Sequence, residues 1–427
     1  MSISLPTVCI VGLGYVGLPL AVRSAEKNYP VIGFDINTKT IASLQSGKSH
    51  FYDEYVDANL AKFPFEATMD ATQIKKADIV LVCVPTPVDE FHNPDLTPVI
   101  SSMQTVAANL KSGALVVLES TVNPGVSEEI VVPIFEAAGW KVGETVYIAH
   151  CPERINPGDP KWNVTNIPRV VGSFDTAGLT LALNFYRTIV DGEIRPMKSI
   201  REAEAVKIVE NSFRDINIAF VNELALSFDK LGIDVKDVIE GASTKPFAFM
   251  AHFPSCGVGG HCIPVDPYYL IERAKRAGFD HKFLRQAREI NNFMPEYTVE
   301  LLQDALNAVK KPINGTKVGV LGLAYKANIA DLRESPSFEI IKHLKKHQAD
   351  IITFDPFVLE KSSVKTLEEI LDQSEALIIA TNHRAFIETL TPELLEKHHI
   401  SVVIDGKNCL NKNAFRESKI IYKGIGR

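Results

Sequence analysis

The sequence predicts an α/β protein in which two doubly wound domains are joined by a central helical region with one long helix. Three observations support this fold. Residues 7–11 form a short apolar run that leads into a glycine-rich turn and a helical segment. The same order of apolar runs returns from residue 317 onwards. Between the two, residues 199–231 contain neither glycine nor proline and stop at Gly232, which predicts a helix about 50 Å long.

Length and composition indicate a large globular protein. A chain of 427 residues is too long for one hydrophobic core, and we expect three regions, 1–198, 199–310 and 311–427. The chain is 46% hydrophobic and 23% charged, as is typical of globular domains. Its formal net charge of −7 argues against nucleic acid as the main partner, because proteins that bind nucleic acid carry a basic surface.

The N-terminus and the cysteines indicate the compartment. No basic segment precedes the first apolar run, and no stretch reaches the roughly eighteen apolar residues of a membrane span. We therefore expect a cytoplasmic protein without a membrane partner, and its six cysteines then favour reduced thiols over disulfides. Cys256, His261 and Cys262 lack a second pair at zinc-like spacing, so we expect no metal site.

The first glycine-rich turn has the pattern of a Rossmann-like dinucleotide site. Its first glycine permits a tight turn, the second lets the backbone approach a pyrophosphate, and the third lets helix and strand pack closely. The apolar run 31–34 then ends in an acid, whose carboxylate would bind the adenosine ribose and repel a 2′-phosphate. A purely structural glycine turn does not explain this acid, so we expect NAD as the cofactor. The expected contacts are Gly12, Gly14, Tyr15, Val16, Gly17 and Asp35.

Polar residues follow the later strands expected in this domain. Thr86, Ser120, Thr121 and Glu153 each come after an apolar run. Because ligands lie at the carboxyl ends of the strands in an open parallel sheet, we expect the three hydroxyl groups to contact cofactor or substrate. Glu153 should lie at the same rim. An alternative, in which the hydroxyl groups cap the following helices, explains each of them equally well.

The long helix carries two candidate donors. Lys207 and Asn211 are four residues apart and therefore lie on one face of the helix, among apolar residues. They could direct two hydrogen-bond donors at one reacting oxygen. A solvated polar stripe is the equally good alternative.

The segment 255–267 combines a thiol with a flexible loop. Gly257, Gly259 and Gly260 allow the backbone to approach a ligand closely, Cys262 offers a nucleophile, and Asp266 offers a carboxylate for proton transfer. On these residues alone, a turn with a buried, inert cysteine is the alternative.

The last third of the chain repeats the first domain with altered chemistry. Gly322 is followed by Ala324 where the middle glycine would stand, and Lys326 occupies the expected start of the helix. We therefore expect a related nucleotide, and no second NAD, in this domain. Lys326 and Arg333 could bind its phosphates, although two solvated loop charges would look the same.

Seven motifs occur in one order along the chain: G-L-G-Y-V-G-L-P from Gly12, P-T-P from Pro85, E-S-T-V-N-P-G from Glu119, P-E-R from Pro152, A-E-A-V-K-I-V-E-N from Ala203, G-G-H-C-I-P-V-D from Gly259 and G-L-A-Y-K from Gly322. Together they resemble the UDP-glucose/GDP-mannose dehydrogenase family over essentially the full length. The resemblance implies a four-electron oxidation of a UDP-sugar. One NAD oxidises the 6-hydroxymethyl group to an aldehyde, a cysteine adds to it, a second NAD oxidises the thiohemiacetal to a thioester, and water releases a uronic acid for surface polysaccharide.

The resemblance also assigns roles to matching positions. It makes Cys262 the nucleophile, with Asp266 and Thr121 handling the hydrolytic water, and Lys207 and Asn211 the oxyanion donors. Glu153 matches a general base that also assists hydrolysis, Lys326 a lysine that holds the substrate, and Arg333 an arginine near the cofactor or the phosphates. The implied substrate contacts are Glu153, Arg154, Lys207, Asn211, Gly257, Gly259, Gly260 and Lys326.

Two positions depart from the UDP-glucose branch of that family. This chain has Val265 where that branch commonly has lysine, and Pro157 where it has a second glutamate. With His261, these residues are similar to the branch that acts on UDP-N-acetylhexosamines. We therefore predict UDP-N-acetylglucosamine or UDP-N-acetylgalactosamine as the substrate, with UDP-glucose and UDP-N-acetylmannosamine as alternatives.

Two other functions remain compatible with a dinucleotide fold and a long helix. A two-electron β-hydroxyacid-type dehydrogenase would need no thiol, and an NAD-responsive binding protein would produce no NADH. Because the long helix is apolar on more than one side, we also predict a homodimer or a higher homo-oligomer with paired copies of this helix.

Overall fold

The computed structural model describes residues 5–89, 94–155, 161–260 and 262–427. It divides into two compact units. The first comprises the chain up to Glu210 together with Tyr268–Phe279, and the second comprises Asn211–Pro267 and Asp280–Arg427. The three regions expected from the sequence, with boundaries near residues 198 and 310, stay a prediction.

The first unit contains an eight-stranded sheet in the order β3-β2-β1-β4-β5-β6-β7-β8. The strands from β3 to β6 are parallel, β7 pairs antiparallel with β6, and β8 is parallel to β7. This is the doubly wound order predicted from the first glycine turn. The strands are β1 (Val8–Val11), β2 (Val31–Phe34), β3 (Glu66–Thr68), β4 (Ile79–Val82), β5 (Ala114–Leu118), β6 (Val146–His150), β7 (Arg169–Ser173) and β8 (Ile194–Pro196).

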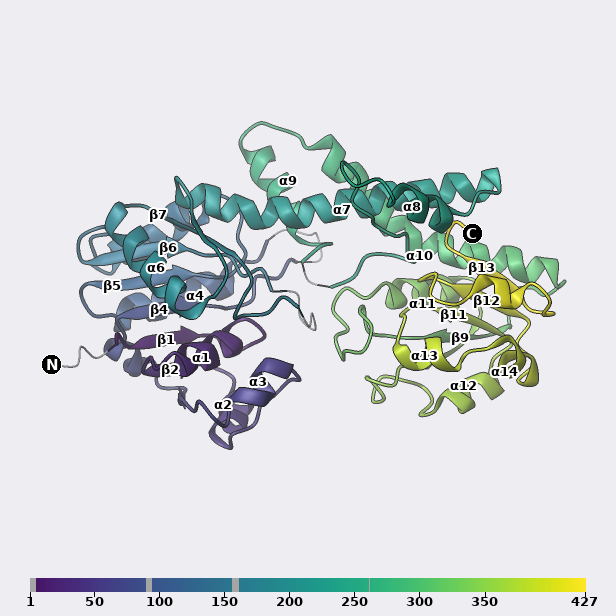
Figure 1. The fold of residues 1–427 in the computed structure, drawn as a ribbon, viewed down its shortest axis with the longest axis horizontal. Helices are drawn as coiled ribbons and strands as arrows, with labels where there is room; N and C mark the ends of the chain where they lie inside the picture. Colours follow the sequence, from purple (N-terminus) through teal and green to yellow (C-terminus); the bar gives the residue numbers. More distant parts are fainter. Residues whose placement is uncertain (1–4, 90–93, 156–160, 261) are drawn as a thin grey trace. The chain divides into compact units, whose positions relative to one another are not determined.

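Helices cover both faces of this sheet, because successive residues of a buried strand point to opposite sides. In β1, Val8 and Ile10 belong to a core that includes residues of α1 and α6, whereas Cys9 and Val11 belong to a second core that includes residues of α4 and α5. Figure 1 shows this unit with its strands between helical layers. Its helices are α1 (Gly17–Glu26), α2 (Thr38–Gln45), α3 (Glu54–Asn59), α4 (Thr97–Asn109), α5 (Val132–Ala137) and α6 (Thr176–Ile189), with a 3-10 turn η1 (Ala71–Lys76) and a π turn η2 (Ser127–Val131).

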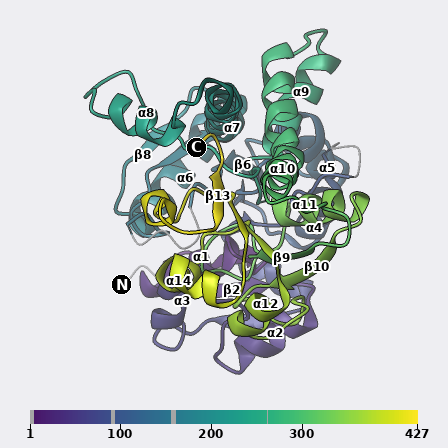
Figure 2. The ribbon, with the colours of Figure 1, turned by 90° about the vertical axis from the view of Figure 1, so that its right-hand side faces the viewer.

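The second unit contains a five-stranded parallel sheet in the order β10-β9-β11-β12-β13. α10 and α11 lie on one face and α12, α13 and α14 on the other (Figures 1 and 2). The first strands of both units are arranged alike, which confirms the predicted repeat. The strands are β9 (Lys317–Leu321), β10 (Asp350–Phe354), β11 (Ala376–Ile379), β12 (Val402–Asp405) and β13 (Ile421–Gly424). The other elements of this unit are α8 (Val235–Ala242), α10 (Lys282–Ala308), α11 (Pro336–Lys346), α12 (Leu367–Gln373), α13 (Arg384–Thr389), α14 (Pro392–Lys397) and η3 (Lys412–Phe415). α9 (Asp266–Arg276) belongs to the first unit from Tyr268 onwards.

The predicted long helix is α7 (Ile200–Leu231), which runs for 32 residues. It ends at Leu231, directly before Gly232, whose φ of +68° is the left-handed conformation that commonly follows a helix. The glycine was therefore the correct stop signal. Among the helices that the structure describes, none is both long and apolar enough to cross a membrane.

His150, the last residue of β6, is an unusual buried group. Its imidazole is fully buried, and neither ring nitrogen has a hydrogen-bond partner among the described residues. Burial lowers the pKa of His150 from 6.5 to about 3, because the charged imidazolium would lose its hydration. The folded protein therefore keeps this histidine neutral.

This group should make the protein sensitive to acid. Between pH 7.5 and pH 5 the unfolded chain takes up a proton on His150 and the folded chain does not, so the free energy of unfolding falls. We expect His150→Leu to reduce that fall, as measured by urea denaturation at both pH values. His399→Asn, at an exposed position with φ of +60°, is the control. An unchanged pH dependence in His150→Leu would refute this interpretation.

Candidate active site

The turn between β1 and α1 has different requirements at its three glycines. Gly12 has a φ of +90°, and a Cβ there would lie 3.0 Å from the carbonyl oxygen of Cys83. A Cβ at Gly17 would lie only 1.9 Å from the carbonyl oxygen of Gly12, whereas a Cβ at Gly14 would have no atom within 4 Å. Packing of the chain thus requires Gly12 and Gly17, while the space beside Gly14 is open to a ligand. The turn fits a dinucleotide pyrophosphate at the start of α1.

Asp35 follows β2 and holds this turn. Its Oδ2 accepts a hydrogen bond from the N–H of Leu13 at 2.7 Å, and its Oδ1 accepts one from the N–H of Asn37 at 2.8 Å. The residue remains partly exposed, and a carboxylate has further lone pairs for a ribose hydroxyl. Tyr15 is 46% exposed beside the turn, and its ring contacts that of Phe51 in a tilted arrangement with centroids 4.1 Å apart. Contacts of Tyr15, Val16 and Asp35 with the cofactor stay predictions.

The hydroxyl residues at the strand ends take part in local packing. Ser120 is buried, and its Oγ donates to the carbonyl oxygen of Val84 at 2.7 Å, which connects the ends of β4 and β5. The carbonyl oxygen of buried Thr86 accepts a hydrogen bond from the hydroxyl of Tyr269 in α9. Thr121 is partly buried. The ligand contacts predicted for these residues remain untested.

Glu153 belongs to a buried array of charges that sequence reasoning missed. Its Oε2 accepts a hydrogen bond from Arg169 at 2.7 Å, and its Oε1 accepts the N–H groups of the next two residues at 2.6 and 2.7 Å. The other arm of the Arg169 guanidinium donates to Glu119 Oε2 at 2.9 Å, and Tyr186 donates its hydroxyl hydrogen to Glu119 Oε1. Arg169, Glu119 and Tyr186 are fully buried and Glu153 is 7% exposed.

The array has a distinctive electrostatic state. Burial raises the pKa of Glu119 to about 7; the positive charge of Arg169 opposes this rise and the Glu153 carboxylate adds to it. Burial also acts to lower the pKa of Arg169, but Glu153 and Glu119 overcome this and raise it. Arg169 therefore stays charged, and Glu119 changes charge near neutral pH.

Two further predicted substrate contacts are Arg154, which directly follows Glu153, and Lys207 of α7. The Arg154 guanidinium forms an ion pair with Glu210 of α7, and its Nη1 donates to the carbonyl oxygen of Pro168 at 2.9 Å. Lys207 lies one turn before Asn211 on α7 and is 9% exposed. Because Arg154 already has protein partners, its part in substrate binding stays a prediction.

In the second unit, three predicted catalytic residues lie together. The Nδ2 of Asn211 donates to Oδ2 of Asp266 at 2.5 Å, and both side chains are buried. The backbone N–H of Asp266 donates to the carbonyl oxygen of Cys262 at 2.9 Å, and the N–H of Val265 also donates to it, at 3.2 Å. Cys262 itself is exposed, unlike Cys256 in the same loop. The buried, inert alternative thus holds for Cys256 and not for Cys262.

The glycines before Cys262 pack directly onto the loop that follows β9. A Cβ at Gly259 would lie 2.6 Å from Cβ of Tyr325, and one at Gly260 would lie 2.7 Å from the ring of the same tyrosine. A Cβ at Gly257 would lie 2.9 Å from Cβ of Pro336. The N–H of Gly260 also donates to the carbonyl oxygen of Arg333 at 3.0 Å. These glycines are therefore required by close packing, and contact with substrate remains an additional, predicted role.

This packing brings the Cys262 loop together with the segment that carries Lys326 and Arg333. The Asp331 carboxylate binds Arg333 through Nε and Nη2 and raises the pKa of its guanidinium. Burial opposes this rise, and the hydrogen bonds and charge of Asp331 outweigh it. Lys326 directly follows Tyr325 and is partly buried. His261 and Pro157, which entered the substrate prediction, lie outside the described residues.

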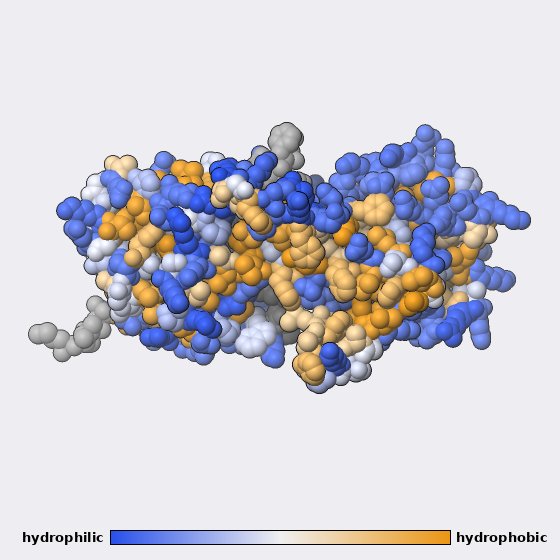
Figure 3. All heavy atoms as spheres, turned by 90° about the horizontal axis from the view of Figure 1, so that it is seen from above, coloured by the Kyte–Doolittle hydropathy of each residue, from blue (hydrophilic) through white to orange (hydrophobic). Residues whose placement is uncertain are grey.

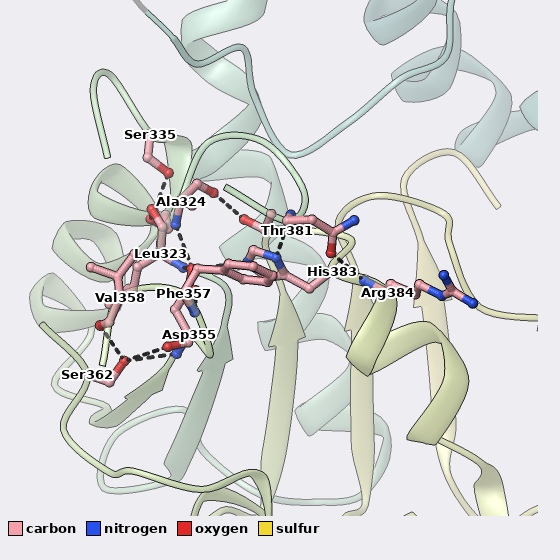
Figure 4. A network of polar contacts seen from close by, with 12 residues as sticks. Leu323, Ala324, Ser335, Asp355, Phe357, Val358, Ser362, Thr381, His383 and Arg384 are labelled. Atoms are coloured by element: carbon pink, nitrogen blue, oxygen red, sulfur yellow. Dashed lines mark hydrogen bonds and ion pairs between the residues drawn. The ribbon is translucent and has the colours of Figure 1, made fainter. Parts of the chain in front are cut away.

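Asp355 occupies in the second unit the place of Asp35 in the first. Its Oδ2 accepts the N–H groups of Leu323 and Ala324 at 2.7 and 2.8 Å and lies 3.1 Å from Nε2 of His383 (Figure 4). The other ring nitrogen of His383 accepts the N–H of Asn328 at 2.9 Å, so Nε2 carries the hydrogen. Burial acts to raise the pKa of Asp355, but these donors overcome it and lower the pKa. Asp355 is fully buried and bound within the protein, a difference that the repeat pattern did not reveal.

Comparisons with known proteins agree with this architecture. Sequence models of the UDP-glucose/GDP-mannose dehydrogenase family match in succession: the NAD binding domain at residues 6–190, the central domain at 201–293 and the UDP binding domain at 319–412. The UDP-N-acetyl-D-mannosamine dehydrogenase of Pyrococcus horikoshii is 34% identical over 424 residues, 98% of this chain and 99% of its own. The UDP-N-acetyl-D-glucosamine 6-dehydrogenase of Pseudomonas aeruginosa is 39% identical over 354 residues, 82% of this chain and 83% of its own.

A solved structure supports the same relationship. The UDP-D-ManNAc dehydrogenase structure from Pyrococcus horikoshii superposes with a TM-score of 0.92 at 34% identity and covers 99% of both chains. The similarity thus extends over the whole fold, and the domain models follow the order of the nucleotide-binding elements described above. This chain belongs to the UDP-glucose/GDP-mannose dehydrogenase family of NAD-dependent oxidoreductases.

Proposed function

We propose that this enzyme oxidises the C6 hydroxymethyl group of UDP-N-acetylglucosamine or UDP-N-acetylgalactosamine to a carboxylate, with Cys262 as the covalent nucleophile. The observation that carries the proposal is the exposed Cys262, on a glycine loop packed against the Lys326–Arg333 segment and followed by Asp266. The UDP binding domain that matches residues 319–412 supports a UDP-sugar as the ligand of the second unit. The two curated relatives described above are named for N-acetylated sugars, which supports the N-acetylhexosamine class.

The first stage removes two electrons from the alcohol. Bound NAD supplies the oxidant for this stage and again for the second one. Glu153 takes the hydroxyl proton, and Lys207 and Asn211 stabilise the negative charge on the substrate oxygen. Lys326 holds the UDP-sugar, and the Gly14 turn with Asp35 holds the cofactor. The product of this stage is the aldehyde.

The second stage uses the thiol. Sγ of Cys262 forms a bond to the aldehyde carbon, the thiol proton leaves through Asp266, and the oxygen gains a proton to give a thiohemiacetal. Removal of two further electrons and two protons gives the thioester. A water molecule, positioned by Asp266 and Thr121, then adds to the thioester carbon. The C–S bond breaks, the sulfur recovers a proton, and the uronic acid leaves.

Replacement of the nucleophile tests this chemistry. We expect Cys262→Ser to lower the rate of uronic acid formation by at least about a hundredfold, because the serine hydroxyl is a far weaker nucleophile than a thiolate. Cys409→Ser, which changes a partly buried cysteine in another part of the second unit, is the control and should retain activity. Acid formation at the wild-type rate in Cys262→Ser would exclude the covalent mechanism and favour a two-electron dehydrogenase.

The sugar is tested by a substrate panel. We expect kcat/KM for UDP-N-acetylglucosamine or UDP-N-acetylgalactosamine to exceed that for UDP-glucose, UDP-N-acetylmannosamine and GDP-mannose by about tenfold or more, the discrimination that one lost contact typically provides. NADH absorbance gives the rates, and mass spectrometry identifies the acid. A preference for UDP-glucose or UDP-N-acetylmannosamine would reject the sugar assignment but keep the reaction. No NADH from any sugar nucleotide would favour a binding protein.

We also propose a homodimer that is formed through the α7–α8 region. Figure 3 looks onto this side of the molecule and shows apolar residues gathered there. Phe213 and Phe220 are seven residues apart on α7, hence on one face, and are 46% and 52% exposed. Exposed apolar patches of this kind mark protein interfaces. Within the second unit the exposed apolar residues of this region are Phe213, Phe220, Leu231, Ile233, Val238, Phe247, Met250 and Phe253.

A charge on this face should separate the subunits. We expect wild-type protein at micromolar concentration to have the mass of a dimer or a higher oligomer by light scattering, and Phe220→Glu to have a smaller mass, because a buried unpaired carboxylate is costly. Ile387→Glu, on exposed α13, is the control and should not change the mass. A wild-type monomer would disprove the proposal.

A further inference from the structure

The buried array around Arg169 lies at the carboxyl ends of the central strands of the first unit. Glu119 directly follows β5, Glu153 comes three residues after β6, and Arg169 is the first residue of β7. Tyr186 reaches the array from α6. In an open α/β sheet this edge is where ligands bind, yet only Glu153 of the four has a proposed contact with substrate.

The geometry of Glu153 leaves little freedom to its carboxylate. One oxygen accepts two backbone N–H groups and the other accepts Arg169, so three donors at 2.6 to 2.7 Å hold the group from two sides. The backbone donors lie in the Glu153 segment itself. Arg169 is the one side-chain donor to Glu153 among the described residues and fixes the second oxygen from another strand.

Arg169 in turn is held by two buried partners besides Glu153. Its guanidinium donates to Glu119 at 2.9 Å, and its charge lies over the ring of Tyr186 at 5.7 Å from the centroid. The Tyr186 hydroxyl occupies the other oxygen of Glu119. A fully buried arginine is stable only when its charge is compensated, and here two carboxylates share it in the geometry of a fork.

We propose that Arg169 is a positioning residue for Glu153, held in place by Glu119 and Tyr186. This inference rests on the proposed function of Glu153 as the group that takes the hydroxyl proton. Arg169 does not touch the substrate. It fixes the carboxylate in one orientation, and Glu119 controls how much of the arginine charge Glu153 receives.

Glu119 should also make the hold of Arg169 on Glu153 depend on pH. The titratable or charged groups that act on it are Arg169, Glu153, Tyr186 and the buried thiols of Cys83 and Cys151. When Glu119 loses its proton, it competes with Glu153 for the same guanidinium. A change in kcat near pH 7 that depends on residue 119 would therefore separate a positioning role from simple structural support.

The test compares two buried arginines of the same unit. Arg169→Lys keeps the charge but cannot bridge two carboxylates. Arg23→Lys is the matched control, because Arg23 is 5% exposed, bonds to Glu26 and Asp191 at 2.8 and 2.9 Å, and belongs to α1, outside this array. We expect kcat of Arg169→Lys to fall about tenfold or more with KM for NAD unchanged, and kcat of Arg23→Lys to stay near wild type.

Glu119→Gln and Tyr186→Phe complete the test and replace Arg169→Lys if that variant does not fold. We expect Glu119→Gln to remove the change in kcat near pH 7 and Tyr186→Phe to lower kcat without altering KM for NAD. The positioning role is refuted if the wild type is active and Arg169→Lys has the kcat and the pH profile of Arg23→Lys. If Arg169→Lys does not fold, the same result for both Glu119→Gln and Tyr186→Phe refutes it. If wild type itself makes no NADH from any sugar nucleotide, the proposed function fails first.

Discussion

The backbone contact between the 257–260 loop and the segment from Tyr325 to Pro336 is the constraint on which the arrangement of the second unit depends. Side chains at Gly259 or Gly260 would come within 2.6 to 2.7 Å of Tyr325, so the contact exists only because these residues are glycines. It places the backbone of the loop before Cys262 directly against the side chains of Tyr325 and Pro336, within the region that matches the UDP binding domain. Cys262, two residues after Gly260, is exposed.

The two doubly wound units share one hydrogen bond at the glycine turn but differ in the exposure of the carboxylate that accepts it. In each, the acid after the second strand accepts the backbone N–H of the residue after the first glycine, at 2.7 Å in both cases. Asp35 then remains partly exposed, whereas Asp355 is fully buried under His383, which also binds the N–H of Asn328. Both units thus contain the same hydrogen bond between this acid and the glycine turn. In the second unit the Asp355 carboxylate is bound by the loop that follows β9.

The sequence predicted the features that depend on local chemistry. The α7 helix and its stop at Gly232, the repeated strand order and the requirement for Gly12 and Gly17 follow from spacing, helix propensity and backbone sterics. The pairing of Asn211 with Asp266 was not predicted, although both residues were candidates, because 55 residues separate them. The Arg169 array was missed for the same reason: its bonds join residues 50 and 67 positions apart, and a lone arginine before an apolar strand carries no signal of its partners.

The central claim is that one site oxidises an alcohol twice through a covalent bond to Cys262. The most direct measurement is the NADH yield at completion, with the preferred UDP-sugar limiting and NAD in excess. The account predicts two NADH for each sugar nucleotide, with the uronic acid as the product by mass spectrometry. One NADH for each sugar nucleotide, with the aldehyde as the product, would contradict it.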